Sequence, residues 1–284
     1  MNSISLFLES SFLWRDAMMV GALSGGLCGF IGVYVVFRRI IFVSATLTQV
    51  SSFGVALAFY LQGVVAGAVS SLIDPFVFSI IFTLLASVFF ALKKEFERIS
   101  QEGIIGFGFL ASSAAVILVG SKITQGAHKV DEILLGNAVV VDPNEIYIIP
   151  AMALVIGIIH FKFFKDFMFV SFNDEMVQLY KYPVKLLNIL LFVTIGVVIA
   201  FSTRAIGALP VFGLLALPPL SALLLTERIK MVFILSTAFG ITAAVTGYFF
   251  SFILSLPTGA MMTFVASIIF LISVLINKLK KQEI

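Results

Sequence analysis

The sequence predicts an all-α protein, a polytopic bundle of transmembrane helices, and three observations support this fold class. Hydrophobic residues make up 61% of the 284 residues and charged residues only 12%, whereas a soluble domain carries about 25% charged residues. The mean hydropathy is +1.15. The hydrophobic residues form long runs, and the alternating polarity of strands is absent. This composition excludes a soluble globular domain, and also a disordered chain, which would need low hydrophobicity.

Nine apolar runs approach the roughly 20 residues that a helix needs to cross a bilayer. The third run is broken by Asp74-Pro75, so an alternative start of this span lies near Pro75, with residues 64–73 as a re-entrant or interfacial segment. The predicted spans are residues 17–37, 41–62, 66–92, 102–120, 146–164, 184–202, 207–225, 231–254 and 259–276.

The cations predict the orientation of the bundle, because Lys and Arg are retained on the cytoplasmic side of a membrane. When the loops are assigned alternately to the two sides, fourteen of the 18 Lys and Arg residues fall on one side. The other four are Arg15, Lys122, Lys129 and Arg204. A single domain over residues 1–284, with nine spans, the N-terminus outside and the C-terminus in the cytoplasm, fits this distribution. Eight spans are the alternative, which requires one apolar run not to cross.

The predicted spans carry no central Asp, Glu, Lys or Arg. Carriers driven by protons or sodium ions bury such groups at mid-membrane. Their absence indicates that the energy for any transport comes from outside the spans. His160, beside Lys162 near the inner end of its run, is expected at the membrane interface. The single cysteine, Cys28, excludes a disulfide framework.

Residues 165–183 form the longest connection on the predicted cytoplasmic side. Asn173 is a suitable N-cap for a short helix, since Asp174 and Glu175 favour a helix N-terminus. Met176 and later apolar residues follow at helical spacing, and Pro183 ends the segment. Such an amphipathic helix on the inner face is a docking surface for another protein. The alternative is an interfacial helix that seals the membrane edge.

Five segments, in order along nearly the whole chain, resemble motifs of one transporter family. They are the glycine-rich residues 20–37 followed by Arg38-Arg39, LLGNAVVVDP at 134–143, SFNDEMVQLYKYPVKLLN at 171–188, the arginine–glycine–proline segment 204–219, and LPTG at 256–259. Together they resemble the permease subunits of the bacterial zinc, manganese and iron ABC importers, the ABC-3 family.

This resemblance implies a dimeric permease domain in the bacterial plasma membrane, with a pathway at the subunit interface. A cytoplasmic ABC ATPase dimer would dock on a coupling helix at about 171–182, through Phe172, Asn173, Asp174, Glu175 and Met176. An extracytoplasmic metal-binding protein would deliver the ion. ATP would be hydrolysed by the partner, because this chain lacks the Walker phosphate-loop motif. We therefore expect no enzyme activity, no cofactor in this chain and no nucleic-acid partner.

The sequence departs from the family pattern in the second span. The family carries an Asp and a His four residues apart, on one helix face, where they hold a divalent cation. The corresponding positions here are Ala45 and Gln49. Thr48, Gln49 and Ser52 still form one polar face with Ala45, which we expect to line the gate; alternatively, these hydroxyl residues hold neighbouring helices together. The metal ligands are therefore unknown.

Three explanations of this departure stay open. The chain could pair with a related permease that keeps the ligands, pass a less demanding or differently chelated metal, or carry another substrate. The function predicted from sequence is the permease subunit of an ATP-binding-cassette importer of divalent transition metal ions (zinc, manganese or iron). The alternative is an ion-coupled secondary carrier or channel that acts without an ATPase.

Overall fold

The computed structural model describes residues 11–65, 73–92, 100–123, 134, 145–172 and 183–282. Within these ranges every regular element is a helix, so the all-α prediction is confirmed. The helices are α2 (Ser11–Phe37), α3 (Ile41–Val64), α4 (Pro75–Ala91), α5 (Gln101–Gly120), α7 (Glu145–Lys162), α8 (Phe164–Phe172), α10 (Val184–Ile206), α11 (Ala208–Leu225), α12 (Ile229–Leu254) and α13 (Thr258–Gln282).

Most of these helices match the predicted spans. Among the described residues, seven helices are long and apolar enough to cross a membrane, and α7 with α8 makes an eighth candidate if this bent pair counts as one span. Helix α4 has 17 residues, which corresponds to a length of about 26 Å. The protein is a multi-pass membrane protein, while the count of nine spans and the orientation stay predictions.

Helix α4 shows why the third apolar run is broken. The side chain of Asp74 accepts a 2.7 Å hydrogen bond from the backbone N–H of Phe76, so Asp74 caps the helix. Pro75 occupies the first turn, where its missing N–H costs nothing. The alternative start near Pro75 is therefore the start of the described helix. Residues 66–72 lie outside the described ranges.

The fifth predicted span, residues 146–164, agrees with α7 to within two residues, and a bend follows at its end. Helix α7 ends at Lys162, the chain turns by 72°, and α8 continues to Phe172. Phe167 and Val170 of α8 are buried against the bundle, so burial of these side chains holds the bent helix on the protein. The sequence analysis placed residues 165–172 in a connection and did not predict this helix, because its burial depends on contacts with helices far away in the chain.

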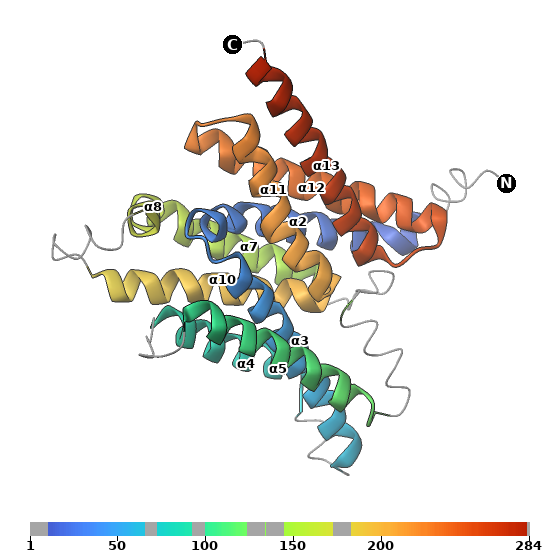
Figure 1. Ribbon diagram of the computed structural model, residues 1–284. Helices are drawn as coiled ribbons and strands as arrows, with labels where there is room; N and C mark the ends of the chain where they lie inside the picture. The colour runs from blue at the N-terminus through green and yellow to red at the C-terminus, as the bar shows by residue number, and fades with distance from the viewer. Residues whose placement is uncertain are drawn as a thin grey trace.

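Figure 1 shows the helices in three groups. Helices α11, α12 and α13 form one group, α2, α7 and α10 lie in the middle, and α4 and α5 flank α3. Helix α10 contacts both outer groups. The closest pairing joins α2 to α12, where glycines let the two backbones meet: a Cβ atom on Gly25 would lie 2.6 Å from the carbonyl oxygen of Gly240.

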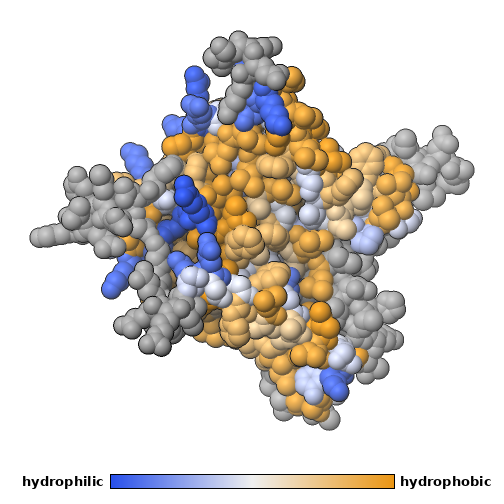
Figure 2. Space-filling model, in the orientation of Figure 1, coloured by the Kyte–Doolittle hydropathy of each residue, from blue (hydrophilic) through white to orange (hydrophobic). Residues whose placement is uncertain are grey.

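The outer surface is apolar, as lipid contact requires. Figure 2 shows hydrophobic side chains over most of the visible face, with hydrophilic ones gathered mainly at the left and top. Large apolar residues stand exposed on α5 and α7, among them Phe107 at 73% and Phe161 at 88% of full exposure. Exposed apolar area of this extent is incompatible with a water-soluble monomer.

Candidate functional site

The predicted gate residues lie together on one face of α3, but this face is mostly covered within the chain. Ala45, Thr48 and Ser52 are buried, with Ala45 only 3% exposed. Gln49 is half-buried and is the most accessible of the four. Offsets of three, four and seven residues place these side chains on consecutive turns of one helix face. Gln49 is therefore the member of this face best placed to meet a passing ion.

The hydroxyl groups of this face bond within α3. Thr48 Oγ1 donates to the carbonyl of Ala45 at 2.8 Å, and Ser52 Oγ donates to the carbonyl of Thr48 at 3.1 Å. Because their protons are engaged in the helix, the oxygen atoms can still act as acceptors or metal ligands. Neither of these two hydrogen bonds reaches a neighbouring helix, and both the gate and the helix-packing roles of this face stay predictions.

Other hydroxyls of α3, which sequence reasoning missed, do join helices. Thr46 Oγ1 lies 3.0 Å from the carbonyl oxygen of Ile105 on α5 and 3.0 Å from that of Phe42 on its own helix, so its one proton is shared between them. Ser51 Oγ lies 2.8 Å from Ser79 Oγ on α4. All these hydroxyls occur in one short run, and only the rotation of α3 decides which of them reach another helix. The sequence thus showed that α3 carries several hydroxyl residues, but not which of them face a neighbouring helix.

The described residues contain no group of three or more His, Cys, Asp or Glu side chains placed to hold a metal ion. The polar face of α3 offers neutral oxygen donors only. Zinc favours imidazole and thiolate, whereas manganese accepts oxygen donors of several kinds. A tightly held zinc ion therefore does not fit this face of a single chain.

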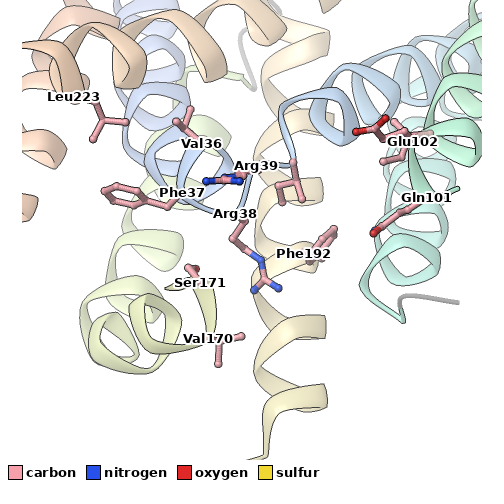
Figure 3. Close-up of a pocket in the computed structure, with 12 residues that line it drawn as sticks. Val36, Phe37, Arg38, Arg39, Gln101, Glu102, Val170, Ser171, Phe192 and Leu223 are labelled. Carbon is pink, nitrogen blue, oxygen red and sulfur yellow. The ribbon is translucent and has the colours of Figure 1, made fainter. Parts of the chain in front are cut away.

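A cavity of about 680 Å³ lies at the end of the bundle where α2 turns into α3 (Figure 3). It brings together the ends of helices that are far apart in the sequence. The Arg38-Arg39 corner lies on one side, Gln101 and Glu102 of α5 on another, and Ser171 of α8 on a third. The corner after the first span and the end of α8 therefore share one end of the bundle.

Arg38 is fixed inside this cavity. Its guanidinium lies 5.6 Å from the centre of the Phe192 ring, a cation–π distance. Burial lowers the pKa of Arg38 to about 10, so the side chain remains a cation at neutral pH. Arg39 is exposed and has a φ of 57°, a left-handed conformation in a non-glycine residue. The corner is therefore a sharply turned, doubly charged connection.

Of the residues predicted to contact the ATPase, only Phe172 lies within the part of the chain that the structure describes. Phe172 is the last residue of α8. Asn173, Asp174, Glu175 and Met176 lie outside the described residues, so the coupling helix stays a prediction. The preceding residue, Ser171, lines the cavity beside the Arg38-Arg39 corner, which is where a segment leading from α8 would begin.

His160, which the sequence placed near the membrane interface, lies inside the bundle and does not face its surface. It is completely buried, and its Nε2 lies 3.0 Å from Thr194 Oγ1 on α10. Its ring contacts Phe30, Tyr34 and Phe167, with centroid distances of 5.7, 5.0 and 4.8 Å. The bend after Lys162 folds α8 over His160, and this fold could not be seen in the sequence.

This fold defines a multi-pass helical membrane protein. The chain belongs to the ABC 3 transport family, whose sequence model matches residues 10–277. It is 27% identical to the manganese transport system membrane protein MntC of Listeria monocytogenes over 95% of this chain and 94% of that one. It is also 25% identical to the manganese import system permease protein ScaB of Streptococcus gordonii, covering 91% and 89% of the two chains.

A solved structure shows the same fold. PsaBC from Streptococcus pneumoniae, in complex with Fab, superposes with a TM-score of 0.81 at 24% identity, over 95% of each chain. The resemblance noted in the sequence motifs is thus confirmed at the level of the family: the chain is a membrane permease of the ABC type.

Proposed function

We propose that the protein is the permease subunit of an ATP-driven importer of divalent transition metal, with manganese as the preferred ion. The observation that carries this proposal is the family match over almost the whole chain together with relatives named as manganese permeases. A permease of this kind hydrolyses no ATP itself, and its energy comes from a separate ATPase.

The chemistry of the α3 face supports manganese over zinc. Thr48, Gln49 and Ser52 present hydroxyl and amide oxygens, and oxygen donors suit manganese better than they suit zinc. Since no carboxylate accompanies them, the ion keeps part of its water shell and binds weakly. Weak binding serves passage through a gate, because an ion that is held tightly leaves slowly. The paired permease, a second copy or a related chain, supplies the rest of the pathway.

The partners follow from the two ends of the bundle. The end that carries the Arg38-Arg39 corner faces the cytoplasm, so the N-terminus lies outside and the C-terminus inside a bacterial plasma membrane. An ABC ATPase dimer docks on the segment after Ser171, through Phe172, Asn173, Asp174, Glu175 and Met176. An extracytoplasmic metal-binding protein presents the ion at the opposite end. The clustering of the α8 end with this basic corner supports the arrangement.

The test is metal uptake into proteoliposomes that contain the permease with its ATPase. We expect manganese uptake that requires ATP, exceeds zinc uptake at equal concentration, and falls several-fold in Gln49→Leu. Val50→Leu is the matched control, since Val50 lies beside Gln49 but lines the apolar groove formed with α4 and α5. Uptake that runs down an ion gradient without ATP would instead establish the carrier or channel alternative.

A further inference from the structure

A fully buried aromatic cluster lies where α7 bends into α8. It contains Tyr34 in the last turn of α2, His160 in α7 and Phe167 in α8, and all three are shielded from solvent. The ring of Tyr34 lies 5.0 Å from that of His160 and 6.1 Å from that of Phe167. Three helices therefore meet on one set of rings, of which two carry a polar atom.

The hydrogen bonds around His160 fix which nitrogen carries its proton. Thr194 Oγ1 donates to the carbonyl of Leu191 at 2.8 Å, so its single proton is already used. The 3.0 Å contact between Thr194 Oγ1 and His160 Nε2 then requires Nε2 to donate. In the neutral imidazole the other nitrogen, Nδ1, is consequently an acceptor.

Two polar groups of this cluster, one donor and one acceptor, have no hydrogen-bond partner among the described residues. His160 Nδ1 and the Tyr34 hydroxyl each lack a hydrogen-bond partner in the described part of the chain. Leaving buried polar groups unpaired is unfavourable. The hydroxyl is a donor and Nδ1 is an acceptor, and the centres of their rings lie 5.0 Å apart across the contact between α2 and α7, so the two unpaired groups are complementary neighbours.

This pair lies between the two parts of the protein that the proposed function uses, the segment after α8 and the gate face of α3. Helix α8 leads into the segment proposed to meet the ATPase. Four residues after Tyr34, the backbone N–H of Arg38 donates to the carbonyl of Tyr34 at 3.0 Å, and the Arg38-Arg39 corner continues directly into α3, which carries the gate face. Only the last turn of α2 and the Arg38-Arg39 corner therefore separate Tyr34 from α3, so a movement of Tyr34 can be passed on to α3.

We propose that Tyr34 and His160 act as positioning residues for transport: in a second conformation of the cycle the Tyr34 hydroxyl donates to His160 Nδ1, and this bond ties movement of α8 to α2 and α3. The inference rests on the proposed function, since it needs an ATPase that moves α8. A population shift of this kind requires an interaction that differs between the two states, and an unmade bond between complementary buried groups supplies one.

The experiment compares manganese transported per ATP hydrolysed in proteoliposomes holding permease and ATPase. Tyr34→Phe removes only the hydroxyl, and His160→Gln keeps a side-chain N–H for Thr194 but removes Nδ1. We expect each to lower the ratio at least threefold and the double variant to be no worse than the lower single variant. Phe30→Leu alters the packing against the rings of Tyr34 and His160 but removes no polar atom, so it should keep the ratio of the unaltered protein. An unchanged ratio in Tyr34→Phe, or independent multiplying losses, overturns the proposal.

A second measurement separates this inference from the proposed function. If the unaltered protein transports no manganese with ATP, the proposed function fails, and the pair is judged from thermal unfolding of the purified permease. Midpoint shifts of the double variant smaller than the sum of the single shifts show that Tyr34 and His160 act on each other. Additive shifts overturn the pairing. The same measurement exposes any single variant that fails to fold, since its transition is lost.

Discussion

The hydroxyl of Ser236 on α12 donates a 2.6 Å hydrogen bond to the carbonyl oxygen of Gly29 on α2. This bond is possible because Gly29 has no side chain, so that the two helix backbones lie in direct contact. Close approach through small residues is a main source of helix association in lipid, where no hydrophobic driving force acts between helices. The α2–α12 contact is therefore a close seam between two helix backbones.

Gly29→Ala should destabilise the permease, because the added methyl group would overlap the backbone of Ser236. Overpacking of this kind costs about 1–3 kcal/mol. The measurement is the thermal unfolding midpoint of the purified protein in detergent. Gly106→Ala in α5 is the matched control, since no heavy atom lies within 4 Å of its new Cβ, and it should unfold at or slightly above the original midpoint. Equal effects at the two glycines would contradict a tight seam.

Restoring the family's ligands, with Ala45→Asp and Gln49→His together, should create a manganese site on α3. Because Ala45 is buried, the new carboxylate is costly without a cation, so the metal-free variant should unfold at a lower temperature. Added Mn²⁺ should reverse this loss, by about 2.7 kcal/mol at a concentration 100 times the Kd. Ala45→Asp with Gln49→Leu, which lacks the imidazole, should recover less. No response to metal in the double variant would remove this face from the pathway.

Cysteine labelling can determine the orientation, since Cys28 is buried and unpaired and should remain silent. Glu227→Cys introduces an exposed thiol in the basic turn between α11 and α12, and Leu256→Cys one in the uncharged turn between α12 and α13. By the retention of cations inside, a membrane-impermeant maleimide added to intact cells should label position 256 and spare position 227. The reverse pattern would invert the proposed topology.

Met176→Pro should abolish ATP-driven uptake without preventing membrane insertion. Proline in a helix interior removes a hydrogen bond and clashes with the preceding turn, at a cost of about 3 kcal/mol or more, so a coupling helix at this position would be lost. ATPase activity and uptake are measured together in proteoliposomes, with Met176→Ala as the control that preserves helix. Undiminished uptake in the proline variant would exclude the segment from coupling.

Much of the fold could be predicted from composition and run length. The boundaries of α3 and α11 agree with the predicted spans to within two residues. This is because a helix in lipid must be apolar along its whole length, so polar residues in the sequence mark its ends. The family also followed from short motifs. The bend after Lys162 and the burial of His160 could not be predicted in this way. Apolar residues that pack inside the bundle and those that face lipid look alike in sequence, so the sequence does not show which helices cover His160.

The candidate site divides in the same way. Its polar face follows from helical spacing alone, since Ala45, Thr48, Gln49 and Ser52 share one side of any helix. The rotation of α3 does not: it turns Thr46 toward Ile105 and Ser51 toward Ser79, leaving Thr48 and Ser52 bonded to their own helix. The sequence by itself determined that this chain is a membrane bundle of a known transport family. Only the tertiary structure decided which hydroxyls reach another helix, which bond within α3, and that the ring of Tyr34 contacts that of His160, because such choices depend on contacts between residues far apart in the chain.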